Sequence, residues 1–351
     1  MPGDETMKAI VQDRAGDPGV LAVRQVPVPP LRSDDVLVRV QRSGVCYHDV
    51  LVRQGVFRKA VQMPLIPGHE VAGIVERVGP AVSDFVIGDR ICTTQRRAVC
   101  GRCRLCRSGR ETLCEAQEFM GDAHLNGGYS QYVAVAQDCA VKVPADVSLD
   151  HAAIAACAIG TQLNAIRDVG RLKAGETVLV TGASGTQGGH GVQLARAMGA
   201  RVLATVSSET AAKVARDHGA HDVIVTPHGI DFSRQVREAT AGAGVDMVVD
   251  NVGTDIFHFI RRSVARGGRW VMVGALSGEQ VSFNTAQLFT SGIDMLSAVS
   301  CSRAQLADCL QLLADGAVKP VIADVVALDA AADAHRRLEC GGVGGKILLH
   351  V

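Results

Sequence analysis

The chain has 351 residues and a balanced formal charge, with 36 Lys and Arg residues against 36 Asp and Glu residues. This length exceeds one ordinary hydrophobic core, so we expect two domains, one of which can interrupt the other. The balanced charge, without a long basic block, excludes the electrostatic footprint of a nucleic-acid-binding protein. A small molecule is therefore the expected partner.

The sequence carries no signal for export or for membrane insertion. Residues 1–5 (MPGDE) have neither a cationic lead nor an apolar run, and the longest aliphatic stretch, residues 152–159, is far shorter than a membrane span. We therefore expect a cytoplasmic protein without a membrane partner. The eleven cysteines then point to metal binding or catalysis rather than to disulfides.

Short β-rich runs cut by Gly and Pro clusters extend from Met7 to about Ala140, for example at residues 36–40 and 71–75. This pattern predicts an irregular β-rich domain. Within it, residues 46–49 (CYHD) and 68–70 (GHE) are short polar motifs. A single cysteine or histidine is more often a packed residue than a ligand.

Together with Cys157, these motifs offer two thiolates and one imidazole, from Cys46 and His69. Three protein ligands leave one coordination position open for substrate or water, which a catalytic Lewis-acid metal requires. The sequence therefore predicts a catalytic zinc site.

A second metal site is predicted from a dense cysteine cluster. Its members are Cys100, Cys103, Cys106 and Cys114. Four thiolates close a tetrahedron around Zn²⁺ without an open position, so this site is expected to be structural. Four unrelated buried cysteines are the alternative, but the segment is rich in Arg and Gly and offers little core to bury them.

From about residue 174 the pattern changes to alternating strands and helices. Strands are expected at residues 177–180, 201–206, 245–249 and 269–273, with an amphipathic helix that ends near Met198. Apolar strands that alternate with helices predict an α/β domain with a parallel, doubly wound sheet.

A glycine-rich turn joins the first of these strands to the helix. It comprises Gly182, Ala183, Ser184, Gly185, Thr186, Gln187 and Gly188. Gly185 allows the backbone to approach a pyrophosphate, and Gly188 allows the helix to pack closely. Ala183 replaces the first glycine of the usual fingerprint, and a tight turn without a ligand is the alternative. The strand–turn–helix context favours a dinucleotide site, in which we also include Val252 and Gly274.

The end of the next strand bears on the choice of cofactor. An acid that binds the ribose hydroxyls of NAD usually stands there, but this chain has Val206, followed by Ser207 and Ser208 and then Lys213. These residues could accept a 2′-phosphate, so NADP(H) is favoured over NAD(H). Surface serines and a solvated lysine are the alternative. Further on, residues 345–350 predict a strand that could rejoin the first domain.

The order of these motifs resembles the zinc-containing medium-chain alcohol dehydrogenases, and the likeness runs from about Met7 to Val351. The resemblance implies a GroES-like catalytic domain that holds both zinc sites and consists of residues 1–155 and 296–351. A Rossmann domain of residues 156–295 would be inserted in it. A homodimer or homotetramer is also implied.

The resemblance further implies roles for individual residues. Cys46, His69 and Cys157 would bind the catalytic zinc. Glu70 would lie near the metal or exchange onto it, and Asp49 would orient His69.

The chain departs from the family pattern at His48, where a Ser or Thr usually passes the proton outward. Imidazole can also carry a proton near neutral pH, so His48 or its neighbour Tyr47 is the expected proton carrier. The same arrangement is similar to acryloyl-CoA-reductase-like members.

Three functions therefore stay open. The first is zinc-dependent hydride transfer between a nicotinamide cofactor and an alcohol, aldehyde or ketone. The second is NADPH-dependent reduction of an activated enoyl compound, and the third is a non-enzymatic zinc- and nucleotide-binding role. The expected apolar residues of the substrate pocket are Phe57, Phe119, Met120 and Leu288.

Overall fold

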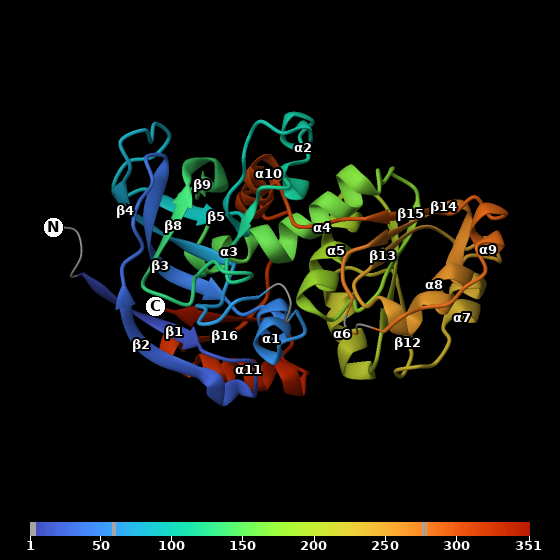
Figure 1. Ribbon diagram of the computed structural model, residues 1–351. Coiled ribbons are helices and arrows are strands. Elements are labelled where there is room, and N and C mark those ends of the chain that lie inside the picture. The colour runs from blue at the N-terminus through green and yellow to red at the C-terminus, as the bar shows by residue number, and fades with distance from the viewer. Residues whose placement is uncertain (1–4, 58–60, 276, 278) are drawn as a thin grey trace. The chain divides into compact units, whose positions relative to one another are not determined.

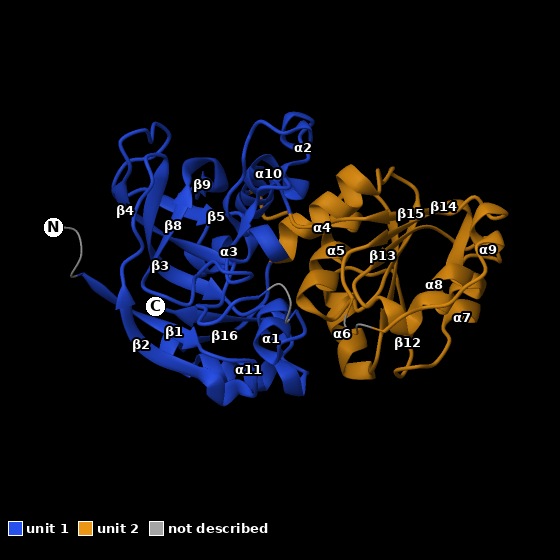
Figure 2. Cartoon of the chain, in the orientation of Figure 1, with its two compact units in different colours: residues 1–157, 301–314, 320–351 blue, residues 158–300, 315–319 orange. Residues whose placement is uncertain are grey.

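The computed structural model describes residues 5–57, 61–275, 277 and 279–351 (Figure 1). The chain divides into two compact units, coloured blue and orange in Figure 2. Unit 1 comprises residues 1–157, 301–314 and 320–351, and unit 2 comprises residues 158–300 and 315–319. The boundaries expected from the sequence lie after residues 155 and 295. In that expectation residues 315–319 belong to the first domain, whereas in the structure they belong to unit 2.

Unit 1 is rich in β-strands, as the alternation of short apolar runs with Gly and Pro predicts. Its strands are β1 (Thr6–Gln12), β2 (Leu21–Pro27), β3 (Asp35–Gly44), β4 (Val71–Val78), β5 (Arg90–Thr93), β6 (Arg96–Ala98), β7 (Glu118–Phe119), β8 (Tyr132–Ala136), β9 (Ala140–Lys142), β16 (Ile322–Ala327) and β17 (Lys346–His350). Its α-helices are α1 (Tyr47–Gln54), α2 (Arg104–Arg107), α3 (Leu149–Ala153), α10 (Arg303–Ala314) and α11 (Ala331–Cys340). Short 3₁₀ turns are η1 (Pro18–Val20), η2 (Glu111–Leu113), η3 (Gln137–Cys139) and η7 (Leu328–Ala330).

The main sheet of unit 1 joins segments that are far apart in the sequence. Its strand order is β16-β17-β3-β4-β5-β9, and β8 pairs with β3 on a side path. The chain returns to this sheet through β17, which runs antiparallel to β3 and parallel to β16. The predicted strand at residues 345–350 is therefore confirmed, and so is its return to the first domain.

Unit 2 contains the predicted alternation of strands and helices. Its strands are β10 (Thr177–Val180), β11 (Arg201–Val206), β12 (Asp222–Val225), β13 (Val245–Asp250), β14 (Val264–Met272) and β15 (Asp294–Ser297). Its α-helices are α4 (Thr161–Leu163), α5 (Thr186–Ala197), α6 (Glu209–Asp217), α7 (Ser233–Ala239), α8 (Phe257–Ser263) and α9 (Ala286–Phe289), with the 3₁₀ turn η6 (Thr254–Ile256). Two π-helical segments precede β10, namely η4 (Ala155–Gly160), which crosses the unit boundary, and η5 (Asn164–Val169).

The sheet of unit 2 has the strand order β12-β11-β10-β13-β14-β15, and each neighbouring pair is parallel. The order reverses at β10, as in a doubly wound sheet, where ligands bind at the carboxyl ends of the strands. The predicted parallel sheet is confirmed. Trp270 and Phe257 lie at the centre of its core, with ring centroids 4.6 Å apart.

The membrane prediction concerns two parts of the chain. Within the described residues, no helix is both long and apolar enough to cross a bilayer. The expectation of no export signal rests in part on residues 1–4, which lie outside the described residues.

Candidate metal centre and nucleotide loop

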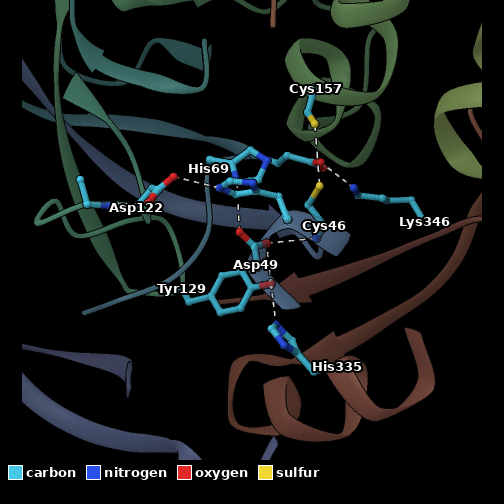
Figure 3. A network of polar contacts seen from close by, with 11 residues as sticks. Cys46, Asp49, His69, Asp122, Tyr129, Cys157, His335 and Lys346 are labelled. Carbon is cyan, nitrogen blue, oxygen red and sulfur yellow. Dashed lines mark hydrogen bonds and ion pairs between the residues drawn. The ribbon is translucent and has the colours of Figure 1, made fainter. Parts of the chain in front are cut away.

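Neighbouring strand ends in unit 1 bring together the residues of the predicted catalytic zinc site. Cys46 follows β3 and is the N-cap of α1, while His69 and Glu70 directly precede β4, the antiparallel neighbour of β3. Cys157 comes from η4 and Lys346 begins β17 (Figure 3). Segments separated by 300 residues of sequence thus meet at one edge of the sheet.

The donor atoms of this site have the spacing of a metal centre. One ligand atom from each of Cys46, His69, Glu70 and Cys157 lies within 4.8 Å of all the others. The two sulfur atoms are 3.9 Å apart, close to the edge of roughly 3.8 Å that Zn–S bonds of about 2.3 Å make in a tetrahedron. The residues present therefore fit a zinc ion.

Glu70 contributes a buried carboxylate with one unused oxygen. Its Oε1 accepts a hydrogen bond from Lys346 Nζ at 2.5 Å, and within the described part of the chain Oε2 is buried without a hydrogen-bond partner. A Cβ at Gly44 would lie 2.0 Å from Oε2, so only glycine leaves room for this carboxylate. Burial raises the pKa of Glu70, although the charge of Lys346 opposes the shift. An unpaired buried oxygen beside three other donors is suited to a cation.

Asp49 holds His69 in a fixed orientation. Its Oδ1 lies 3.0 Å from His69 Nδ1, and its Oδ2 accepts the backbone N–H of Cys46, which also caps α1. Burial raises the pKa of Asp49, but the charge and the hydrogen bond of the adjacent His69 oppose this effect. The net result is a pKa well below the usual range of an aspartate. Burial lowers the pKa of His69, and the charges of Asp49 and Cys46 reverse this, so that the pKa lies well above its ordinary value.

The two thiols differ in their readiness to ionise. A hydrogen bond from Cys157 lowers the pKa of Cys46 well below its usual range, and although burial opposes the shift, the positive charge of Lys346 supports it. The same hydrogen bond and burial raise the pKa of Cys157. Cys46 is therefore the thiolate of the pair, and a thiolate is the form that binds metals.

His48 lies beside the donor set between two phenylalanines. Its ring stacks on Phe57 with centroids 5.3 Å apart and meets the edge of Phe119 at 5.6 Å. Its Nε2 is 3.1 Å from Asp122 Oδ2. Burial raises the pKa of Asp122, but the hydrogen bond from His48, the backbone N–H of Ala123 and the nearby histidine charges together lower it below its ordinary value. Asp122 therefore accepts the hydrogen bond as a carboxylate.

The remaining candidates for a substrate pocket belong to different elements of the fold. Met120 is fully buried and belongs to a core cluster of unit 1 that consists largely of valines. Leu288 belongs to α9 of unit 2. Tyr47, the alternative proton carrier, is the first residue of α1 and is 38% exposed.

The four clustered cysteines also come together. Their sulfur atoms lie within 4.8 Å of one another, with 3.5 Å between Cys114 and Cys100 and 4.0 Å between Cys100 and Cys106. Backbone N–H groups of Arg102 and Cys103 lower the pKa of Cys100 to about 6. Burial and thiol neighbours raise the pKa of Cys106 to about 12. This donor set fits a closed zinc site without an open position.

The glycine-rich loop of unit 2 has the geometry that a dinucleotide requires. Gly182 adopts a positive φ of 59°, and Gly185 is the N-cap of the twelve-residue helix α5. A Cβ at Gly188 would lie 2.3 Å from the carbonyl oxygen of Gly182, so glycine is needed where the helix approaches the strand. Ala183 is fully buried and donates its N–H to Thr205 O at 3.2 Å.

The other residues of the expected cofactor site lie at strand ends in unit 2. Val206 is buried at the end of β11, and Ser208 caps α6 by accepting the N–H of Ala211. Lys213 is exposed and pairs with Asp217 one helical turn on. The remaining members are Ser184 in the glycine-rich turn, Thr186 and Gln187 at the start of α5, Ser207 after β11, Val252 after β13 and Gly274 after β14.

Four residues of unit 1 near the metal donors were missed from the sequence. They are Lys346, Asp122, Tyr129 and His335. None belongs to a predicted zinc-ligand motif, and tertiary folding brings each to the site. No local signal could have identified them.

Comparison with known proteins agrees with this arrangement. Residues 32–145 match the family model described as "Alcohol dehydrogenase GroES-like domain", and residues 188–315 match the one described as "Zinc-binding dehydrogenase". An alcohol dehydrogenase from Geobacillus stearothermophilus is 34% identical over 98% of this chain and 100% of its own length.

Two further similarities extend this comparison. An acryloyl-coenzyme A reductase from Metallosphaera sedula is also 34% identical, over 98% of this chain and 99% of its own. The crystal structure of AibC superimposes with a TM-score of 0.92 at 42% identity, and the match covers 100% of this chain and 96% of that one.

Proposed function

The chain belongs to the zinc-containing medium-chain dehydrogenase/reductase family, and from this premise we propose that it transfers a hydride between NADP(H) and an alcohol or carbonyl compound at a catalytic zinc ion. Membership of the family confirms the resemblance seen in the sequence and, with it, the GroES-like and Rossmann folds. The chain is accordingly an oxidoreductase of the zinc-type family. The substrate class, the zinc dependence and the cofactor preference are our proposal.

The buried donor set is the observation that carries the zinc proposal. Cys46, His69 and Cys157 would hold the ion, and Glu70 Oε2 supplies a fourth oxygen that can approach or leave it. When bound, zinc polarises a carbonyl oxygen or stabilises an alkoxide, and the nicotinamide supplies or accepts the hydride. A protein without catalytic activity has no chemical need for such an arrangement.

His48 is the residue best placed to move the alcohol proton. It lies two residues after Cys46, and its ring is 5.4 Å from that of His69. Asp122 holds it by a hydrogen bond at 3.1 Å, and its side chain is 30% exposed. A histidine that contacts solvent on one side and a metal ligand on the other can pass a proton outward, which is the part that a Ser or Thr usually plays.

The NADP(H) preference is supported by what stands at the end of β11. Val206 offers no carboxylate to a ribose, and the hydroxyl groups of Ser207 and Ser208 follow it. The next carboxylate along the chain is that of Glu209, the first residue of α6. Replacing Glu209 by Gln is therefore expected to strengthen the preference for NADP(H), because it removes an acid just after β11 that would repel a 2′-phosphate.

Reduction of an activated enoyl compound is the second candidate. Two observations favour it, namely His48 in place of the usual hydroxyl and the similarity to acryloyl-coenzyme A reductases. In that reaction the hydride adds to the β-carbon of a conjugated carbonyl. The metal would then polarise the carbonyl or have no catalytic part.

The two functions can be separated by replacing the zinc ligands. Cys46→Ala, His69→Ala and Cys157→Ala should each lower carbonyl reduction at least about a thousandfold, because several kcal/mol of transition-state stabilisation is lost. Cofactor binding should stay nearly intact, since the nucleotide loop lies in unit 2. The assay follows NADPH consumption with aldehydes, ketones and enoyl thioesters.

Cys92→Ala is a matched control, because Cys92 is fully buried in the same unit but belongs to neither donor set. It should keep full activity. Full retention of enoyl thioester reduction in the zinc-ligand variants would refute the carbonyl proposal and place the enzyme with the ene-reducing members.

A further inference from the structure

A chain of buried hydrogen bonds leads from Arg53 to the metal ligand His69, and Figure 3 shows its part from His335 to His69. Arg53 Nε donates to His335 Nδ1 at 3.3 Å, and His335 Nε2 lies 3.3 Å from the Tyr129 hydroxyl. Tyr129 donates to Asp49 Oδ2 at 3.1 Å, and Asp49 Oδ1 lies 3.0 Å from His69 Nδ1. All five side chains are at most 1% exposed.

The direction of every hydrogen bond in this chain follows from its first member. A guanidinium group has donors but no acceptor, so His335 Nδ1 must accept from Arg53. The neutral ring then carries its proton on Nε2 and donates to the oxygen of Tyr129. Tyr129 is left with one proton, which it donates to the Asp49 carboxylate.

The protonation of the intermediate groups agrees with this direction. Burial lowers the pKa of His335 to about 4, and the charge of Arg53 adds to the shift, so the ring is neutral. Burial and the neighbouring Asp49 carboxylate raise the pKa of Tyr129 well above its usual value, so the hydroxyl keeps its proton.

Arg53 itself is fixed by contacts on all sides. Its Nη1 donates to the backbone oxygen of Gly16 and its Nη2 to Glu339 Oε1, both at 2.5 Å. Gln12 in turn donates to the backbone oxygen of Arg53 at 3.1 Å. The guanidinium group therefore cannot turn away from His335 without breaking its hydrogen bonds to Gly16 and Glu339, which is costly.

We propose that Arg53, His335 and Tyr129 are positioning residues that hold the Asp49 carboxylate in the orientation that presents His69 Nε2 to the metal. Asp49 can rotate about its terminal bond, and a single contact with His69 would not fix the plane of the carboxylate. The backbone N–H of Cys46 and the hydroxyl of Tyr129 both donate to Asp49 Oδ2 and together define the second direction. This inference rests on the proposed function in one respect, namely that His69 is a metal ligand.

The test uses the affinity of the protein for zinc. Tyr129→Phe removes only the hydroxyl group. We expect the zinc site that contains His69 to bind the metal about tenfold more weakly, which is the lower end of the range for residues that hydrogen-bond to metal ligands. The measurement is a competition with chelators of graded affinity, followed by metal analysis. The four-cysteine site is an internal reference and should be unchanged, because a merely structural role would not single out one site.

Three further variants complete the design. Tyr132→Phe is the matched control, since Tyr132 is a half-buried tyrosine three residues further on that is not part of this chain of hydrogen bonds. His335→Leu should weaken zinc binding as Tyr129→Phe does. His335→Gln should restore most of the affinity, because Gln keeps one acceptor and one donor.

The proton on His69 Nδ1 gives a second readout in the zinc-loaded protein. By nuclear magnetic resonance it should be shifted downfield and protected from exchange, and Tyr129→Phe should speed its exchange. Equal zinc affinity and equal exchange in Tyr129→Phe and the unaltered protein would overturn the inference.

Failure of the underlying function has a different signature. In that case His69→Ala keeps both zinc ions, whereas failure of the positioning role leaves His69→Ala with one zinc and Tyr129→Phe with unchanged affinity.

Discussion

Replacement of Lys346 by Met isolates the buried charge pair behind the metal donors. Lys346 Nζ and Glu70 Oε1 are 2.5 Å apart, and their side chains are 6% and 0% exposed. Burial lowers the pKa of Lys346, but the charges of Glu70 and Cys46 raise it above its ordinary value, so the ammonium group stays charged. Without Lys346, Glu70 loses the cation that opposes the effect of burial, and its other oxygen already lacks a hydrogen-bond partner within the described part of the chain.

Breaking a buried pair by removing one partner costs about 3–5 kcal/mol of unfolding free energy. For a unit of roughly 200 residues this corresponds to a fall in melting temperature of roughly 6–20 °C. Calorimetry at a fixed free zinc concentration measures the effect, because bound metal also shifts the transition. Lys142→Met is the matched control, since Lys142 pairs with Asp89 but its own side chain is 55% exposed, and should cost less than about 1 kcal/mol.

The double variant Lys346→Met with Glu70→Gln should recover more than half of the lost unfolding free energy, because it also replaces the buried carboxyl group that has lost its partner. A loss below about 1 kcal/mol in Lys346→Met, or a double variant less stable than either single one, would refute this reasoning.

Three other predictions follow from the structure. Metal analysis of protein purified without chelators should give close to two zinc ions per chain, and a single zinc that is lost in Cys103→Ser would mean that the His69 site is empty. NADP(H) should bind more tightly than NAD(H) in titrations, and Val206→Asp should shift the preference toward NAD(H). Tighter NAD(H) binding by the unaltered protein would end that proposal. Burial depresses the pKa of His335 from 6.5 to about 4 in the folded protein, so unfolded chains bind a proton between these values that folded chains exclude. The contribution of this group to stability is therefore present above about pH 6.5 and is lost as the pH falls toward 4, by at most about 3 kcal/mol. The free energy of unfolding, measured by denaturation at a series of pH values, should depend less on pH in His335→Gln than in the unaltered protein. An equal dependence on pH would contradict the assignment.

Local sequence patterns predicted the elements whose cause is itself local. The strand at residues 177–180 and the glycine-rich turn after it are encoded in one short stretch, because a buried strand, a tight turn and a helix each leave a periodic or compositional signal. The four-cysteine cluster is similar, since its ligand spacing is contained within residues 100–114.

The residues that complete the metal site could not be predicted in the same way. Lys346 lay in a predicted strand, but the register that points it toward Glu70 is set by pairing between β17 and β3. Tyr129 and His335 meet only after α11 has packed against unit 1. Such contacts depend on long-range packing, which a single sequence does not reveal.

The pairing of β17 with β3 also bears on when the two candidate zinc sites are completed during synthesis. The four-cysteine loop is complete once the ribosome has passed residue 114, so its zinc can be acquired on the nascent chain. The donor set of Cys46, His69, Glu70 and Cys157 gains its counter-charge only with Lys346, after the whole of unit 2 has been translated. We therefore expect the second site to reach its final charge balance only when β17 has joined the sheet (Figure 1).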